Sequence, residues 1–401
     1  MFAFVFTQRH ESVEVATRKV ATVVPEATGS LTRPWNREMS GPTIMVSPKP
    51  MPRVLLLHTG GTLGMDSGAS YEVGSDGQEV LKQGGTYHKA GTLRPGSMLN
   101  SLLQVVPELK SLAHLDIKVA FNKDSSGVGP REWIQLAKML DSQREFYDAF
   151  LVVHGTDTMA YTASAVSFML HNFRKPIVFT GSQLPLAMAR SDARQNLIDS
   201  LTCATAYFTP PHIYFQEVAV CFGGRLMRGN RCRKVNSSAY RAFDSPSYPY
   251  LASMGVDVEW QPRNLLHCEG VYRTRFKLNP HVLRVPIVPG CDPREAYGDL
   301  AGRGVRGLVL ESFGVGNMPD ATAAGWLPWL HDQRKKGVIM SMISQCSLGP
   351  LQPELYRSGS VALKLGIEAG PQMTPESAVT KMMLCLEYPD LPLGMPLAGE
   401  M

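Results

Sequence analysis

Short runs of apolar residues that end in glycine turns recur through the first half of the chain. Continuous apolar runs of about five residues are typical of parallel strands that are buried on both faces of a sheet. The glycines that follow them allow tight turns that other residues reach only with strain. The pattern predicts strands at Arg53–His58, Phe150–His154 and Pro176–Thr180, and an alternating segment predicts a further strand at Leu115–Asn122.

Segments of helical length and pattern follow these strands. We expect helices over residues 130–139, 160–170 and 193–207, and Pro130 suits the first position of the first of them. The repeated order of strand, turn and helix predicts a parallel α/β sheet with right-handed crossovers.

The last third of the chain repeats this alternation on a smaller scale. Strands are predicted at Val282–Val288, Gly307–Leu310 and Val338–Ile343, with helices over residues 326–331 and 375–386. The predicted fold class is therefore α/β, with a larger N-terminal parallel-sheet domain followed by a smaller C-terminal α/β domain.

Shifts in composition predict the domain boundaries. Residues 1–50 are expected to form a poorly structured extension, whose four glutamates argue against an organelle-targeting role, and the polar stretch 66–96 is either a functional lid or disordered. The predicted divisions are an N-terminal domain at 51–250, a linker at 251–279 and a C-terminal domain at 280–395.

Composition and charge exclude several classes of protein. With 44% hydrophobic and 19% charged residues among 401, the chain can bury a core and is not globally disordered. The net charge of +5 is small and spread along the chain, so we expect no nucleic-acid partner. No apolar run is long enough to span a bilayer, and the apolar start Met1–Phe6 is too short for a secretory signal. We therefore expect a cytoplasmic protein with no membrane partner.

Cysteine spacing points to a reducing compartment. The seven cysteines are odd in number and contain no C-x-x-C pair, so we expect free thiols. Neither a zinc-ligand spacing nor an H-E-x-x-H motif occurs. The sequence therefore predicts no metal and no cofactor.

The turns after the three strongest strands share one chemistry. They read Thr59-Gly-Gly-Thr-Leu-Gly64, Gly155-Thr-Asp-Thr158 and Gly181-Ser-Gln183, so each places a hydroxyl beside glycine. Ligands bind at the carboxyl ends of parallel strands, where backbone N–H groups can hold an oxyanion and an activated hydroxyl can attack a carbonyl. One such turn is ordinary strand-end geometry, but three together indicate a site. The P-loop and G-x-S-x-G motifs are absent.

Several longer motifs make the chain recognisable. The segments Thr59–Met65 and His154–Met159, continued by Ala160–Leu170 and Lys175–Gln183, resemble the signatures of the bacterial-type L-asparaginases. The likeness extends through Arg190-Ser-Asp192, Asn196-Leu197, Arg228-Gly-Asn-Arg231 and Phe313-Gly-Val-Gly-Asn317, and so covers residues 53–390. In detail the motifs resemble those of the cytoplasmic type I branch and its animal relatives.

The resemblance implies a role for each of several residues. It implies Thr62 as the nucleophile and Tyr71, on the following loop, as a residue that helps activate it. The second signature supplies Thr156, which Lys175 is expected to polarise. The substrate-binding residues that it implies are Asp157 for the α-ammonium group, and Ser125 with Ser126 for the α-carboxylate.

Each assignment has an alternative that needs no function. Lys175 could be a solvated charge at the start of a strand, and Tyr71 a surface aromatic. Asp157 could cap the helix that follows it, although a capping carboxylate can also bind substrate.

The function implied is hydrolysis of the side-chain amide of L-asparagine to L-aspartate and ammonia through a threonine acyl-enzyme. The alternatives are a glutaminase or a tRNA-dependent amidotransferase subunit, a non-catalytic binding protein, and an acyl-ester hydrolase. The resemblance also implies a homodimer or homotetramer in which Asn317 reaches a neighbouring subunit's site.

Two positions depart from the family pattern. Gly127 replaces an Asp that usually follows the Ser-Ser pair in cytoplasmic relatives, which changes the polar surroundings expected for the substrate. Glu311 replaces an Arg that bacterial type I members use in regulation by asparagine. Because an ionised Glu repels a carboxylate, we expect a second asparagine site to be weakened or absent and the response to be hyperbolic. The alternative is that Arg306 or Lys336 supplies the clamp from elsewhere.

Overall fold

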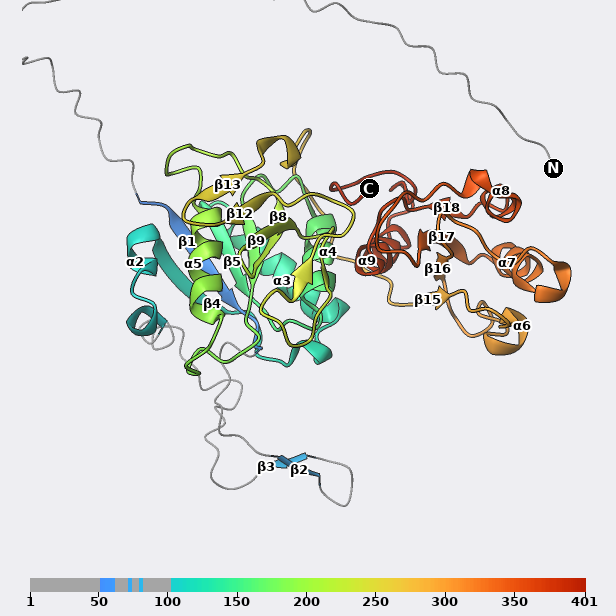
Figure 1. Ribbon diagram of the computed structural model, residues 1–401, viewed down its shortest axis with the longest axis horizontal. Coiled ribbons are helices and arrows are strands. Elements are labelled where there is room, and N and C mark those ends of the chain that lie inside the picture. The colour runs from blue at the N-terminus through green and yellow to red at the C-terminus, as the bar shows by residue number, and fades with distance from the viewer. Residues whose placement is uncertain (1–50, 62–70, 74–78, 82–101) are drawn as a thin grey trace, which may run out of the picture. The chain divides into compact units, whose positions relative to one another are not determined.

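Residues 51–61, 71–73, 79–81 and 102–401 are described by the computed structural model (Figure 1). The extension predicted over residues 1–50 and the predicted nucleophile Thr62 lie outside the described residues. So does most of the polar stretch 66–96, apart from β2 (Tyr71–Val73) and β3 (Glu79–Leu81), which pair antiparallel.

The larger domain is built on an eight-stranded sheet in the order β13-β12-β9-β8-β7-β5-β1-β4. The strands from β8 to β4 in this order run parallel, as the sequence predicts, whereas β9, β12 and β13 continue the sheet antiparallel. In chain order these strands are β1 (Arg53–His58), β4 (His114–Val119), β5 (Ala149–Val153), β7 (Ile177–Thr180), β8 (Val218–Phe222), β9 (Arg225–Arg228), β12 (Ala252–Met254) and β13 (Val258–Trp260).

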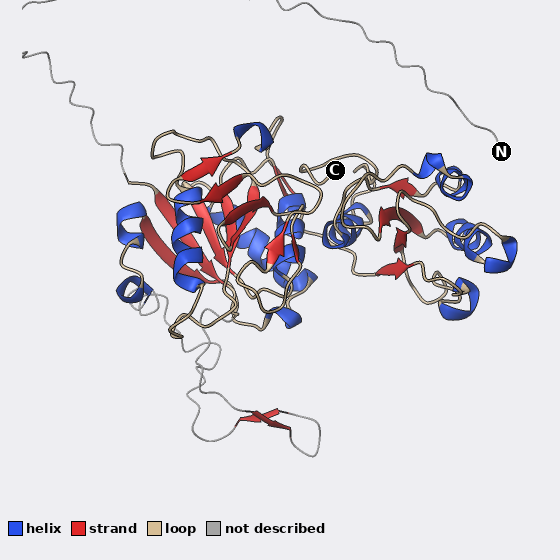
Figure 2. Ribbon diagram, in the orientation of Figure 1, coloured by secondary structure: helices blue, strands red, loops and turns tan. Residues whose placement is uncertain are grey.

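Both faces of this sheet are buried, which explains the continuous apolar runs in its strands. Leu55 and Leu57 of β1 belong to one apolar cluster, and Val54 and Leu56 belong to another on the opposite face. Helices α3 and α4 contribute to the first cluster, and α2 and α5 to the second, so the strands lie between helices (Figure 2). The helices are α2 (Leu109–Leu112), α3 (Pro130–Gln143), α4 (Met159–Met169) and α5 (Ala193–Ala204).

The predicted linker 251–279 is in large part an element of the first domain. Strands β12 and β13 lie in the main sheet, and β14 (Arg273–Thr274) pairs antiparallel with β6 (Leu170–His171) after α4. The predicted boundary at residue 250 is therefore too early. Strands of two or three residues carry too little alternation to be seen in a sequence. These segments form strands because β12 pairs with β9 and β14 pairs with β6.

The C-terminal domain has a parallel four-stranded sheet in the order β15-β16-β17-β18. Helices α7 and α8 cover one face through residues such as Trp329 and Ala362, and α9 covers the other through Met382. Because α9 also packs against α4, it joins the two domains. The elements are β15 (Val282–Pro286), α6 (Pro293–Ala296), β16 (Gly307–Ser312), α7 (Trp326–Lys335), β17 (Ile339–Ser344), α8 (Arg357–Lys364), β18 (Glu368–Ala369) and α9 (Pro375–Cys385).

The predicted fold class is thus confirmed, with a larger N-terminal and a smaller C-terminal α/β domain. Short elements complete the described chain: η2 (Ser125–Gly127), β10 (Arg233–Lys234), β11 (Phe243–Asp244), η3 (Pro262–Asn264), η4 (Thr322–Ala324) and η5 (Pro353–Leu355). The seven cysteines carry free thiols, as the spacing predicts.

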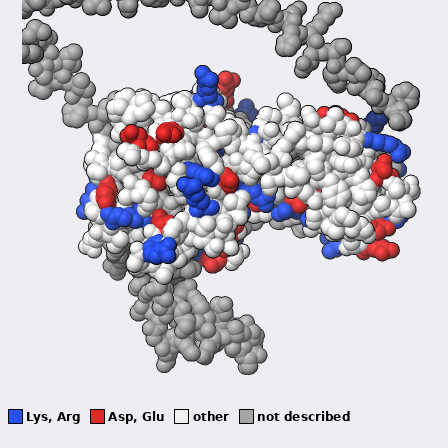
Figure 3. Space-filling view, viewed as in Figure 1, with Lys and Arg blue, Asp and Glu red and all other residues white. Residues whose placement is uncertain are grey.

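The described surface shows no concentration of one charge on the face seen in Figure 3, where basic and acidic side chains are interspersed. Of the helices in the described ranges, none is both long and apolar enough to cross a membrane.

Candidate active site

The turns after β1 and β5 meet backbone against backbone. Gly60 and Gly61 have φ angles of +108° and +89°, which residues with a side chain rarely adopt. A Cβ atom at Gly61 would lie 2.6 Å from backbone atoms of Gly155, and one at Gly60 would collide with the backbone of Lys123. Glycine is therefore required here so that three chain segments can close on one point. Thr62 follows Gly61 directly but lies outside the described residues.

Thr59 fixes the end of β1 in this arrangement. Its backbone N–H donates to the carbonyl oxygen of Val153 at 3.1 Å, and its hydroxyl donates to the same oxygen at 2.9 Å. The first threonine of the turn thus ties β1 to β5.

Ser125 lies against the turn that carries Thr156 and Asp157. Its hydroxyl oxygen accepts the N–H of Asp157 at 3.2 Å, and its carbonyl oxygen accepts the Thr158 hydroxyl at 2.7 Å. The structure therefore brings Ser125, Thr156 and Asp157 together. Ser126 is exposed, and its hydroxyl donates to Asp124 Oδ1 at 2.6 Å.

Lys234 is the basic residue at this turn, and the sequence reasoning missed it. Its Nζ donates to Thr156 Oγ1 at 2.8 Å and to Asp157 Oδ1 at 2.7 Å. The Thr156 side chain is buried, whereas that of Asp157 is 62% exposed. The sequence feature that could have pointed to Lys234 is the motif Arg228-Gly-Asn-Arg231, which ends three residues before it.

The prediction that Lys175 polarises Thr156 is wrong. Lys175 Nζ donates instead to the carbonyl oxygens of Arg144 at 2.5 Å and Tyr147 at 2.7 Å. Because β5 and β7 are parallel, with Val153 opposite Thr180, a residue that precedes β7 lies at the amino edge of the sheet. Thr156 follows β5 at the carboxyl edge, more than about 10 Å away along the strands. Burial lowers the pKa of Lys175. Its two hydrogen bonds hold the chain just after α3 and do not involve Thr156.

The remaining predicted residues lie elsewhere or outside the described part. Tyr71 is in β2, of which only the backbone is described. Asn317 Oδ1 accepts the Met318 N–H at 2.9 Å and the Ser358 hydroxyl at 2.7 Å, so this oxygen is engaged within its own domain. Glu311 is buried and pairs with Arg284 Nε at 2.5 Å, so an arginine of the adjacent strand neutralises it.

His154 supports the turn from inside the protein. Because a carbonyl oxygen only accepts, Nδ1 donates to Gly155 O at 2.7 Å, and Nε2 then accepts from the Thr162 hydroxyl at 3.0 Å. Burial lowers the pKa of His154 to about 4. The imidazole is therefore neutral at neutral pH and acts as a structural bridge between the turn and α4.

Within the described ranges, no group of three or more His, Cys, Asp or Glu side chains is placed to hold a metal ion. The chemistry that these residues can support is that of hydroxyls polarised by an ammonium group, beside a carboxylate. An α/β domain that places such a set at the carboxyl ends of parallel strands has the construction of a hydrolase that uses a side-chain nucleophile.

Comparison with known proteins agrees with this class. The family model described as "Asparaginase, N-terminal" matches residues 53–265, and the "Glutaminase/Asparaginase C-terminal domain" matches residues 281–391. The chain therefore belongs to the asparaginase family, as its motifs predict.

The chain is similar to several named proteins. L-asparaginase 1 of Escherichia coli K12 is 35% identical over 260 residues, which are 65% of this chain and 74% of the relative. The L-asparaginase of Thermococcus kodakarensis is 31% identical over 84% of this chain and 93% of its own. The 60 kDa lysophospholipase of the mouse is 33% identical over 86% of this chain, which spans only 60% of that longer protein. The solved structure of L-asparaginase I from Vibrio cholerae superposes with a TM-score of 0.71 at 31% identity, over 88% of this chain and 99% of its own.

We expect the buried His154 to make the fold sensitive to mild acid. Its pKa is lower in the folded state than the ordinary value of 6.5, so its stabilising effect is complete above pH 6.5 and is lost towards pH 4. Between pH 7 and pH 5 the free energy of unfolding should fall by on the order of 2 kcal/mol through this residue alone. Urea unfolding at both pH values measures it. The His154→Gln variant should lose this share of the pH dependence, and an unchanged slope would contradict the assignment.

Proposed function

We propose that the chain hydrolyses the side-chain amide of L-asparagine to L-aspartate and ammonia. The observation that carries this proposal is the contact of Lys234 Nζ with both Thr156 Oγ1 and Asp157 Oδ1, at the turn against which Gly61 closes. Thr62 is the next residue after Gly61 in the sequence. Relatives named L-asparaginase support the choice of substrate.

In the proposed reaction the hydroxyl oxygen of Thr62 attacks the amide carbon, assisted by Tyr71. The new carbon–oxygen bond forms, the carbon–nitrogen bond breaks, and the nitrogen leaves as ammonia with the proton from Thr62. Water then attacks the acyl carbon, and cleavage of the bond to Thr62 releases aspartate and restores the hydroxyl. Backbone N–H groups of the glycine turns are suited to stabilise the oxyanion in both steps.

Lys234 and Thr156 are proposed to support proton transfer in these steps. Because the ammonium group donates to Thr156 Oγ1, it stabilises negative charge on that oxygen and makes the Thr156 hydroxyl a better proton donor. The lysine thus takes the role that the sequence assigned to Lys175. No metal or cofactor enters the proposed reaction.

The ends of the substrate have candidate partners on the same turn. The exposed carboxylate of Asp157 can bind the α-ammonium group of asparagine. Ser125, whose hydroxyl accepts the Asp157 N–H, can donate its own proton to the α-carboxylate. Ser126 is a weaker partner because its hydroxyl already donates to Asp124.

Two alternative activities come from relatives. A protein of Pyrococcus furiosus that is named as part of a glutamyl-tRNA(Gln) amidotransferase is 31% identical over 85% of this chain, and the mouse relative is named a lysophospholipase. Assays with glutamine and with a lysophospholipid, run beside asparagine, distinguish a glutaminase-type or acyl-ester activity from the proposed one. The face seen in Figure 3 carries mixed charges and offers no basic stripe of the kind that binds tRNA.

Self-association to a homodimer or homotetramer and a cytoplasmic location stay predictions. The amide oxygen of Asn317 is held by Ser358 and Met318, so any role across a subunit boundary falls to its NH₂ group. Light scattering on the active protein measures the assembly, and an active monomer would argue against it.

The first test is release of ammonia from asparagine by the wild type and by Thr62→Ala. We expect the variant to lose on the order of 10³-fold or more in kcat, because it removes the nucleophile. The variant should keep the thermal unfolding transition of the wild type. A folded Thr62→Ala protein with near-normal ammonia release would exclude the proposed acyl-enzyme.

The second test compares two lysines by the same substitution. Lys234→Met should lower kcat by about 10²-fold or more, because Thr156 loses its charged partner. Lys175→Met should leave kcat within about twofold and lower the free energy of unfolding by about 2 kcal/mol, because two carbonyl oxygens lose a charged donor. Steady-state kinetics and urea unfolding measure both effects. The reverse pattern would return the catalytic role to Lys175.

The third test asks what Asp157 binds. Asp157→Asn should lower kcat/KM for asparagine by roughly 30-fold, which corresponds to about 2 kcal/mol for an ion pair in a site open to solvent. For succinamate, which lacks the α-amino group, kcat/KM should change little. An equal loss on both substrates would show that Asp157 is not the partner of the ammonium group.

A further inference from the structure

Residues 397–400 form a turn that is closed by the side chain of Glu400. The carboxylate accepts the backbone N–H groups of Leu397 at 2.9 Å and Ala398 at 2.8 Å. It also pairs with Lys381 Nζ of α9 at 2.6 Å, and both side chains of this ion pair are 0% exposed. Removal of either partner would leave the other charge buried and unpaired, so Glu400 and Lys381 depend on each other for their places.

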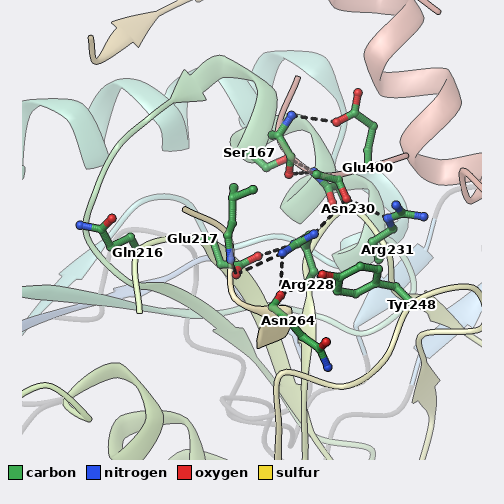
Figure 4. A network of polar contacts seen from close by, with 12 residues as sticks. Ser167, Gln216, Glu217, Arg228, Asn230, Arg231, Tyr248, Asn264 and Glu400 are labelled. Atoms are coloured by element: carbon green, nitrogen blue, oxygen red, sulfur yellow. Dashed lines mark hydrogen bonds and ion pairs between the residues drawn. The ribbon is translucent and has the colours of Figure 1, made fainter. Parts of the chain in front are cut away.

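The turn presents two carbonyl oxygens to the segment Arg228–Arg231 of the first domain. Asn230 Nδ2 donates to Ala398 O at 2.9 Å, and Arg231 Nε donates to Gly399 O at 2.8 Å (Figure 4). Arg228 Nη1 also donates to Gly399 O, at 3.2 Å. The polar side chains of this short segment thus bind a backbone turn that lies about 170 residues later in the sequence.

The same segment is held from its other side. Arg228 forms an ion pair with Glu217 at 2.5 Å, and both side chains are buried. The guanidinium groups of Arg228 and Arg231 lie 4.4 and 5.0 Å from the ring centre of Tyr248. Burial and the charge of Arg228 lower the pKa of Arg231 to about 10, and Glu400 opposes this shift. The turn at 397–400 therefore supplies acceptors and a negative charge that this crowded basic segment needs.

This segment leads directly into Lys234. Arg231 is three residues from it, and the intervening Arg233 lies 3.8 Å from Glu376 of α9. Lys234 Nζ makes two bonds at once, at 2.8 and 2.7 Å, to atoms of one turn, so the position of the Lys234 backbone bears on both. A displacement of about 1 Å at such a site can lower a rate about 10²-fold.

We propose that Glu400 is a positioning residue for Lys234. By closing the turn at 397–400, it holds the segment Arg228–Arg231 and so sets where Lys234 meets Thr156. This inference rests on the proposed function, because it assigns Lys234 a part in the reaction. It adds that the C-terminal end of the chain controls that part through a turn far from Thr156 in the sequence.

The test is a double-mutant cycle on ammonia release from asparagine. Glu400→Gln should lower kcat about tenfold or more in the wild-type background, with a smaller change in KM. In the Lys234→Met background the same substitution should lower kcat less than twofold, because the group that it positions is already absent. A role in overall stability alone predicts the same factor in both backgrounds, and that result would overturn the proposal.

Leu300→Ala is the matched control, because Leu300 is buried in the core of the C-terminal domain and has no part in the turn at 397–400. It should lower the melting temperature yet keep kcat near the wild-type value when both proteins are assayed well below their transitions. A fall in kcat equal to that of Glu400→Gln would make the effect one of domain stability.

Two further measurements keep the test decisive. If Glu400→Gln does not fold, Arg231→Lys enters the same cycle, since it keeps the positive charge but not the donor pair to Gly399 and Gln372. Crystal structures of the wild type and variant give the distance from Lys234 Nζ to Thr156 Oγ1 without reference to activity. We expect it to exceed 3.5 Å in the variant, and an unchanged 2.8 Å would overturn the inference. A wild type that releases no ammonia would refute the proposed function and leave this distance as the test.

Discussion

The close approach of Gly61 to Gly155 is the constraint on which the candidate site depends. A Cβ atom at Gly61 would lie 2.6 Å from the backbone of Gly155, and one at Gly155 would lie 2.7 Å from the side chain of Ser125, so this packing of the strand ends requires glycine at both positions. In the sequence each of these glycines is followed by a threonine, Thr62 after Gly61 and Thr156 after Gly155. Parallel pairing directs the ends of β1 and β5 to the same edge of the sheet, and the glycines allow their backbones to approach closely.

The basic group at this point comes from a different part of the fold. Lys234 lies on the two-residue strand β10, which follows the antiparallel strand β9 and pairs with β11 outside the main sheet, and not on one of the parallel strands that carry the motifs. A short strand holds its position weakly by itself. The segment before it is instead fixed by contacts with Glu217, Tyr248 and the turn at 397–400. Segments that are far apart in the sequence thus position one lysine at the site.

The pairing of Arg284 with Glu311 bears on regulation in a similar way. A carboxylate stands where the resemblance to the type I branch leads us to expect an arginine, and the adjacent strand supplies the positive charge that balances it. The charge of the pair is near neutral, so this place differs from one that offers an unpaired guanidinium to a ligand carboxylate.

The sequence alone determined the fold class and the residues of the turns, because continuous apolar strands, glycine turns and long motifs are local features of the chain. Thr156, Asp157 and Ser125 come together in the structure because parallel strands align their carboxyl ends, which is a rule that a sequence can use.

The local sequence does not show which of Lys175 and Lys234 contacts Thr156. Both are lysines near a signature motif, and only the tertiary structure decides that the first lies at the amino edge of the sheet and the second at Thr156. The short strands β12 and β13 and the buried pair of Lys381 with Glu400 were likewise beyond the sequence. Their residues gain a defined place only through partners far along the chain, and no periodicity encodes that pairing.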